Sequence, residues 1–246
     1  MQLATATWPE VEAYLATCTG IVVPIGSTEQ HGPNGLIGTD ALCAEAVARG
    51  VGEATGALVA PTLSIGMAEH HMAFPGTITL KPSTLVALIG DVVGALAEHG
   101  FDRFLFVNGH GGNIPSLNAA FYEVHAARRA TRPEAPGLRM RIANWFLGPA
   151  VGRLAAELYG DNEGSHATPS EVSLTQHLLP EHIKPATFSG PAPRGSFHDR
   201  HDVRRRFPDG RMGSDPSLSR PEHGARLLDT AVGEIAEAWH RLLAED

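Results

Sequence analysis

Short apolar runs alternate with amphipathic helical stretches along most of this chain. Residues 21–25 and 104–107 are short and mostly β-branched or aromatic, which is typical of buried strands. Residues 40–55 and 83–99 instead carry apolar side chains every three or four positions, which is typical of helices packed on a sheet. Strands and helices that alternate in this way favour βαβ units. We therefore predict an α/β fold in three α/β/α layers, with a mostly parallel central sheet.

The same patterns extend over the rest of the 246 residues. They predict further strands over 57–63 and 138–145, further helices over 117–129, 171–179 and 222–244, and an extended loop over 188–220. That loop exceeds ordinary connections in length, so we expect it to be functional, interfacial or mobile. The chain length and a hydrophobic content of 43% suit one large domain, which we assign to residues 1–246.

Charge and cysteine content argue against several classes of function. The net charge of −8 provides no basic surface for nucleic acid, and no run of residues is apolar enough to span a membrane. The first residues carry no secretion signal, and Cys18 and Cys43 form no CxxC pair, so we expect a cytoplasmic protein. Histidine is abundant, with 13 copies, and it is both a metal ligand and an acid–base group.

Polar side chains follow the first predicted strand directly, in the segment EQHGPNGLIGTD. Glu29 and His31 are two residues apart, so in extended backbone both side chains point to the same side. Asp40 lies at the expected start of a helix. The segment is either a solvated loop in which Asp40 caps the helix, or part of a metal site. Ligands in open α/β sheets bind beyond the carboxyl ends of the strands, which favours the metal site.

Two further polar clusters can also be interpreted in two ways. His110 stands in the segment NGHGGN after a predicted strand, either as an incidental residue of a glycine-rich turn or as a ligand kept apart from core packing. His166 and Glu171 surround an expected helix start, where Glu171 either complements the helix dipole or binds a metal. The adjacent His70 and His71 point in different directions, so we expect at most one of them to face a site.

Together the clusters supply three carboxylates and two imidazoles, but no thiolate. The five candidate metal ligands are Glu29, His31, Asp40, His110 and Glu171. Such a mixed oxygen and nitrogen set suits a pair of divalent cations, with Zn, Mn and Fe as candidates. One carboxylate that bridges two cations about 3.5 Å apart is an ordinary hydrolase arrangement. We therefore predict two divalent metal ions per chain.

The order and spacing of these motifs resemble those of the creatininase (creatinine amidohydrolase) family, over about residues 5–240. The motifs are EQHG (29–32), Asp40, FPGT (74–77), NGHGGN (108–113), and His166 followed five residues later by Glu171. The resemblance implies an α/β/α fold with a binuclear metal centre, in which Glu29 and His110 bind one ion, His31 binds the other, and Asp40 bridges them. It also implies that His166 is a proton donor near the substrate, and that the chain forms a homo-oligomer, which is a hexamer in many members.

Two departures from the family pattern bear on the ligand set and the substrate. Creatininase itself has a glutamate ligand at the position of Gly112, so we assign the fifth ligand to Glu171. It also has a tryptophan over its substrate where this chain has Asn162, whereas another substrate-site tryptophan is retained as Trp145. We predict that Trp145 and His71 bind substrate.

The resemblance identifies the chain as a metal-dependent hydrolase acting on carbon–nitrogen bonds other than peptide bonds. The predicted reaction is cleavage of an amide or cyclic amide in a small molecule through metal-activated water, with His166 protonating the leaving nitrogen. Creatinine is one candidate substrate. The alternatives are a family member acting on a formamide or modified-peptide bond, and a non-catalytic metal-binding protein that keeps the fold. We expect no nucleic-acid or membrane partner.

Overall fold

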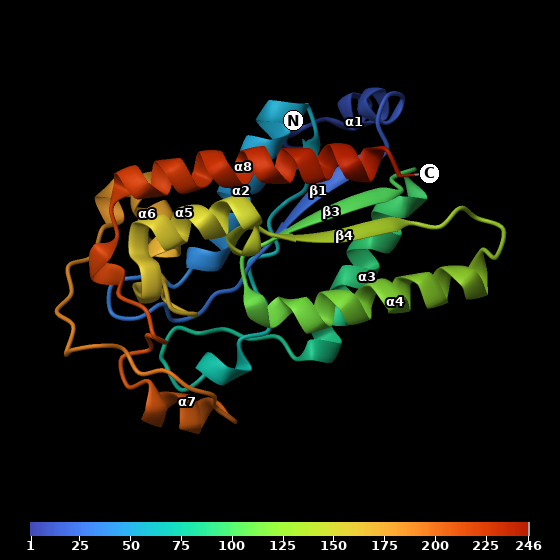
Figure 1. The fold of residues 1–246 in the computed structure, drawn as a ribbon. Coiled ribbons are helices and arrows are strands. Elements are labelled where there is room, and N and C mark those ends of the chain that lie inside the picture. Colours follow the sequence, from blue (N-terminus) through green and yellow to red (C-terminus); the bar gives the residue numbers. More distant parts are fainter. Residues whose placement is uncertain (246) are drawn as a thin grey trace.

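Four parallel strands form the centre of the protein, whose computed structural model describes residues 1–245 (Figure 1). The strands are β1 (Gly20–Ile25), β2 (Leu58–Val59), β3 (Arg103–Asn108) and β4 (Arg139–Asn144). Their order across the sheet is β2-β1-β3-β4, and every pairing is parallel. The predicted α/β class and parallel sheet are therefore confirmed.

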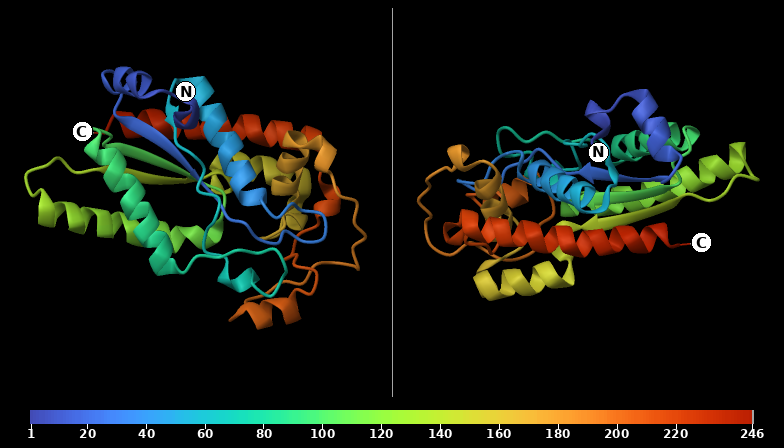
Figure 2. Two further views of the ribbon diagram at one scale, coloured as in Figure 1. Left: turned by 180° about the vertical axis from the view of Figure 1, so that it is seen from behind. Right: turned by 90° about the horizontal axis from the view of Figure 1, so that it is seen from above.

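Helices cover both faces of this sheet, which confirms the three predicted layers (Figures 1 and 2). The helices are α1 (Trp8–Leu15), α2 (Thr39–Thr55), α3 (Pro82–Glu98), α4 (Ile114–Thr131), α5 (Pro149–Tyr159), α6 (Pro169–Leu178), α7 (Arg200–Arg206) and α8 (Pro221–Leu243). Alternate strand residues pack into two separate cores. Val22 and Val107 belong to the core under α2 and α8, whereas Val23 and Phe106 belong to the core under α3 and α4.

Several element boundaries differ from the predicted ones. The predicted strand 57–63 shortens to β2, because only Leu58 and Val59 pair continuously with β1. The predicted loop 188–220 contains α7, which was not predicted because it has only seven residues, most of them charged. Its first turn is capped by Asp199, whose side chain accepts hydrogen bonds from the backbone of His201 and Asp202. Helices α1 and α5 were also not predicted.

Three strands end at one edge of the sheet, where the polar segments begin. In the register, Ile25 of β1 lies beside Asn108 of β3, which lies beside Asn144 of β4. Gly26 and Gly109 follow directly, and the Gly109 amide donates to the Ile25 carbonyl at 2.8 Å. The segments that carry Glu29 and His110 therefore start next to each other.

No helix among residues 1–245 combines the length and the apolar character that crossing a lipid bilayer requires.

Candidate metal centre

All five predicted metal ligands and His166 lie together beyond this edge of the sheet. They come from four segments: the loop after β1, the start of α2, the loop after β3, and the start of α6. Glu29, His31, Asp40, His110 and His166 are buried, and the Glu171 side chain is 15% exposed. The structure thus brings together residues that are far apart in the sequence, such as Glu29 and Glu171, which are 142 positions apart.

Asp40 lies at the middle of the cluster and does not cap its helix. Gly38 is the N-cap residue of α2, and no side chain caps that helix end. Instead, Asp40 Oδ1 lies 3.1 Å from His31 Nε2, and Asp40 Oδ2 lies 3.3 Å from His110 Nδ1. The two oxygens of one carboxylate therefore face two different imidazoles.

Each of these imidazoles also faces a backbone carbonyl with its other nitrogen. His31 Nδ1 lies 3.1 Å from the carbonyl of Glu29, and His110 Nε2 lies 2.9 Å from that of Met67. Metal-binding histidines commonly donate their second N–H to such a carbonyl, which fixes the ring and turns the other nitrogen toward the ion. In both rings that other nitrogen faces Asp40.

Glu171 serves a helix cap and the cluster at the same time. It is the third residue of α6 and forms a capping box with Thr168, whose amide donates to Glu171 Oε1 at 2.9 Å. The same oxygen lies 3.4 Å from His31 Nε2. The helix-end interpretation of Glu171 is therefore correct, and it does not remove the residue from the cluster.

Glu29 provides a buried carboxylate whose two oxygens differ. Ser27 donates a hydrogen bond to Oε2 at 2.8 Å, and His110 Nε2 lies 3.3 Å from the same oxygen. Among residues 1–245, Oε1 has no hydrogen-bond partner, although His71 Nε2 lies 3.4 Å away. Asp40 Oδ2 is also buried without a hydrogen bond. A buried carboxylate oxygen without a partner is costly, and a bound cation would satisfy both of these.

The pKa values show how strongly these groups interact. Burial disfavours the charged form of His31, but the carboxylates of Asp40 and Glu171 outweigh it and raise its pKa to about 10. Burial likewise disfavours the charged form of His110, but the carboxylates of Glu29 and Asp40 outweigh it and raise its pKa to about 9. Burial raises the pKa of Glu29 to about 7, and the two histidines hold the pKa of Asp40 below its usual range despite its burial. The carboxylates thus attract positive charge strongly, as a cation site must.

The distances between donor atoms suit an ion of zinc size. Tetrahedral ligands about 2.05 Å from an ion are about 3.3 Å from one another. His31 Nε2 lies 3.1 Å from Asp40 Oδ1 and 3.4 Å from Glu171 Oε1, which matches this spacing. Among the described residues, three groups of side chains bring their ligand atoms within 4.8 Å of one another: Glu29, His31 and Asp40; His31, His166 and Glu171; and Glu29, His71 and His166. His110 is in none of them, because its two nitrogens face different carboxylates.

Gln30 connects the two remaining histidines beside the cluster. Its side-chain nitrogen lies 2.9 Å from His71 Nδ1 and 2.8 Å from His166 Nε2. His166 Nδ1 lies on the other side of its ring, 3.8 Å from Glu29 Oε1. Burial and the neighbouring His31 lower the pKa of His166 well below its usual value. Sequence reasoning did not identify Gln30, because it resembles any polar loop residue.

A cavity of about 390 Å³ opens onto the cluster. Asp40, His110, His166 and Glu171 line one part of it. His70 and His71 both line it as well, so the prediction that at most one of them faces a site is wrong. Apolar and sulfur-containing side chains also line it, namely Phe146, Leu147, Phe197 and Met212. Trp145 does not line this cavity: it is 2% exposed and packs in the core under α2 and α8. The cavity wall is formed by its neighbour Phe146 instead, and the predicted substrate contact of Trp145 stays a prediction.

Gly112 admits no side chain in this arrangement. A Cβ atom there would lie 2.3 Å from His110 Nε2 and 2.7 Å from the Met67 carbonyl. Ala167, which joins His166 to Thr168 at the start of α6, has a φ of 53°, a left-handed backbone conformation that is uncommon outside glycine. Neither the crowding at Gly112 nor the conformation of Ala167 was predicted.

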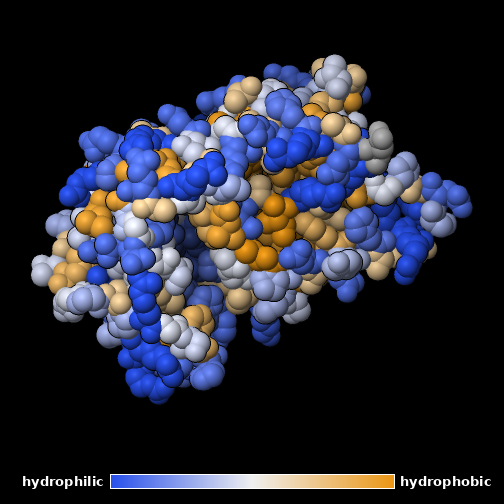
Figure 3. Space-filling view, in the orientation of Figure 1, coloured by the Kyte–Doolittle hydropathy of each residue, from blue (hydrophilic) through white to orange (hydrophobic). Residues whose placement is uncertain are grey.

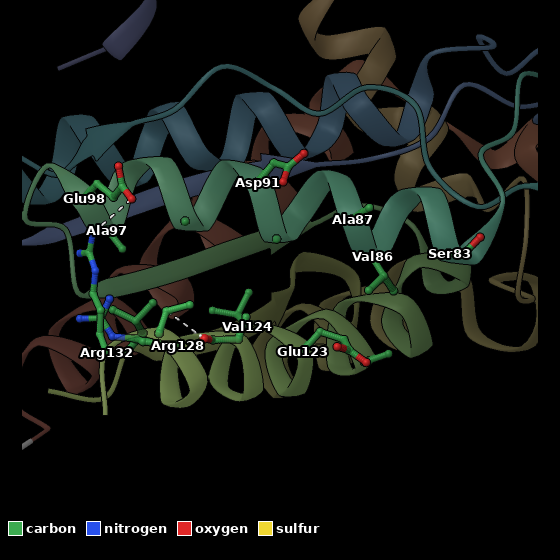
Figure 4. Close-up of a pocket in the computed structure, with 16 residues that line it drawn as sticks. Ser83, Val86, Ala87, Asp91, Ala97, Glu98, Glu123, Val124, Arg128 and Arg132 are labelled. Carbon is green, nitrogen blue, oxygen red and sulfur yellow. Dashed lines mark hydrogen bonds and ion pairs between the residues drawn. The ribbon is translucent and has the colours of Figure 1, made fainter. Parts of the chain in front are cut away.

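A larger cavity of about 650 Å³ lies elsewhere, between α3 and α4 (Figure 4). It shares no lining residue with the cavity at the cluster. Its charged groups include Arg132 and Glu98, which pair with each other at 3.3 Å, and its lining contains no histidine. We therefore assign the chemistry to the smaller cavity.

The chain matches the family model "Creatininase: Creatinine amidohydrolase" over residues 4–239. It is similar to a creatinine amidohydrolase of Pseudomonas putida, with 31% identity over 252 residues that cover 94% of this chain and 93% of that protein. It is also similar to a solved structure described as "Creatininase Mn", with a TM-score of 0.87, 26% sequence identity and 99% coverage of both chains.

A second kind of relative carries a different name. The chain is 33% identical over 189 residues to a "Mycofactocin precursor peptide peptidase" of Mycobacterium ulcerans (strain Agy99). The match covers 73% of this chain and 65% of that relative, so the chain spans somewhat less than two thirds of its length.

Proposed function

Because this chain belongs to the creatininase family, we propose that it hydrolyses a carbon–nitrogen bond of an amide or cyclic amide with the help of two divalent metal ions. The observation that carries this proposal is Asp40, whose two oxygens face His31 and His110 at 3.1 and 3.3 Å. A carboxylate in that position is suited to bridge two ions.

The remaining ligands divide between the two sides of Asp40. We assign His31 and Glu171 to the side of Oδ1, since the two face each other at 3.4 Å. We assign His110 to the side of Oδ2, which its Nδ1 faces at 3.3 Å, and we place Glu29 on the same side because the family resemblance pairs it with His110. The lack of room for a side chain at Gly112 supports Glu171 as the fifth ligand.

Nitrogen and oxygen ligands without thiolate suit Zn, Mn or Fe, and these remain our candidates. When bound, such ions lower the pKa of water and polarise a carbonyl oxygen. The chain supplies the rest of the site. Phe146, Phe197 and Met212 give one part of the cavity an apolar wall, and Gln30 contacts the rings of His71 and His166.

We propose that His166 carries the proton of the reaction. Nδ1 faces the cluster, 3.8 Å from Glu29 Oε1, and from there it can take a proton from the attacking water and then pass it to the leaving nitrogen. An amide nitrogen leaves poorly unless it is protonated. Gln30, close to Nε2, fixes the orientation in which Nδ1 faces the cluster.

We expect His166→Ala to lower kcat by about 10²–10⁴, the usual contribution of a positioned acid–base group. Steady-state kinetics and metal analysis on the same sample check this. His182→Ala is the control, since His182 is an exposed residue that pairs with its neighbour Glu181 and lies outside the cluster. Unchanged turnover with full metal content would disprove the proton-carrying role, and so would the loss of a metal ion, which would make His166 a ligand.

The function itself is tested by metal analysis combined with a screen of amides. The screen includes creatinine, other cyclic amides, formamides and short peptides. We expect two ions per chain and hydrolysis of at least one class of amide. Chelation of the metal should stop this hydrolysis, and added Zn or Mn should restore it. Two bound ions without hydrolysis of any class would instead favour a metal-binding protein without catalysis.

A peptide-like substrate is the second candidate function. The relative named as a precursor peptide peptidase supports it, as does Asn162, which stands where creatininase has a tryptophan over its substrate. We also propose that residues 1–246 act as one domain, since the family match spans 4–239. The homo-oligomer and the cytoplasmic location stay predictions.

A further inference from the structure

A second cavity of about 450 Å³ adjoins the cavity at the metal centre. It is lined by Glu69, His70, His198, Asp199, Arg200 and His201. His70 lines both cavities, so the two adjoin at this side chain. The outer cavity lies where the turn Glu69–His71 meets the beginning of α7, and this part of the surface is strongly hydrophilic (Figure 3).

Flat rings stack on His70, the residue that the two cavities share. The His70 ring is nearly parallel to that of Phe197, at 14° and 5.4 Å between centroids. It is also nearly parallel to the ring of His110, at 9° and 6.0 Å. His70 and Phe197 both line the inner cavity, and Phe197 directly precedes His198 of the outer one. A flat amide chain that left the cluster along these rings would reach the outer cavity.

The outer cavity offers hydrogen-bond donors that are not already used. Arg200 is paired with Glu69, and Asp199 accepts hydrogen bonds from the backbone of His201 and Asp202 at 2.8 Å. The imidazoles of His198 and His201 are exposed, and within residues 1–245 neither has a hydrogen-bond partner. The carboxylates of this cavity are therefore engaged, while two imidazoles remain free to donate.

We propose that the two cavities form one extended substrate site. The scissile bond lies at the metal centre, the chain passes His70, and a distal end that accepts hydrogen bonds, such as a carboxylate, lies against His198 and His201. This inference rests on the proposed function and narrows it to elongated, peptide-like amides. The inner cavity alone is at the lower end of the usual range of about 300–1,000 Å³ for ligand sites, and the outer one extends it.

The test uses acetylated glycine peptides with two or four glycines and a free carboxylate. For the metal-loaded wild-type protein, we expect kcat/KM to be at least tenfold higher for the longer peptide. In the double variant His198→Ala/His201→Ala, we expect the ratio between long and short peptides to fall below threefold. His182→Ala should keep the wild-type ratio. A wild-type ratio near one, or a ratio that the double variant leaves unchanged, would overturn the extended site.

Binding separates this inference from the function on which it rests. Isothermal titration calorimetry with the same peptides measures the contribution of the outer cavity to binding, independently of kcat. We expect a Kd at least tenfold lower for the longer peptide. If affinity depends on length but no peptide is cleaved, the extended site stands and peptide hydrolysis fails. If both peptides are cleaved equally and bind equally, the hydrolase stands and the extended site fails.

Discussion

The variant Asp40→Asn is expected to lower kcat/KM by roughly a thousandfold or more, beyond the 10–100-fold that supporting residues of a metal site contribute. Asparagine keeps the shape of the side chain but has one oxygen instead of two. Its NH₂ group must face either His31 or His110, which Asp40 approaches at 3.1 and 3.3 Å. One side of the centre therefore loses its ligand, and the negative charge that favours both cations is lost as well.

Metal analysis and kinetics on the same preparation check this result. We expect one bound ion or fewer per chain, with a circular dichroism spectrum like that of the wild type. Asp91→Asn is the matched control, because Asp91 is an exposed residue of α3 away from the cluster. An Asp40→Asn protein that holds two ions and keeps a tenth of its activity would contradict the bridging role.

Gly109→Ala is expected to reduce the free energy of unfolding by about 3 kcal/mol or more, at the upper end of what overpacking costs. A Cβ atom at this position would lie 2.1 Å from the Asp40 carbonyl oxygen and 3.3 Å from Ala44. The obstacle is backbone of α2, which cannot rotate away as a side chain could. The loop after β3 and the start of α2 would have to separate, and this would also move Asp40 away from His110.

Urea denaturation of the two proteins measures this difference. Gly111→Ala is the matched control, since it makes the same change in the same loop but its Cβ would meet no atom within 4 Å. We expect the control to lie within about 0.5 kcal/mol of the wild type, as substitutions at unconstrained positions usually do. Equal losses in both variants would mean that the contact with α2 is not the cause.

The fold was largely predictable because its long elements have strong patterns. Helix α3 begins one residue before the predicted start and ends one residue before the predicted end, since its apolar stripe and its glycine stop are both in the sequence. Helix α7 could not be predicted from periodicity, because seven residues with one buried apolar side chain, Val203, show no stripe. Strand β2 was overestimated, because apolar character continues beyond the residues that pair.

The cluster was predictable where ligands follow strands, as Glu29 and His110 do, and where a family motif names them. The groups that orient the histidines of the cluster were not predictable. The carbonyl of Met67 orients His110 through backbone alone, which leaves no trace in residue types. Gln30 contacts His166 across 136 positions, and no local pattern encodes such a contact. Trp145 was identified by resemblance; it packs in the core, and its predicted contact with substrate stays a prediction.

The four segments of the cluster also imply an order of assembly. Glu29, His31, Asp40 and His110 are contributed by the first 110 residues, whereas Glu171 arrives with α6, which packs extensively against the C-terminal helix α8. Contacts between residues so far apart form late, because closing long loops costs chain entropy before any contact repays it. During synthesis the chain would thus expose an incomplete ligand set for as long as α8 is missing. We therefore expect the complete ligand set to form only after α6 has packed against α8.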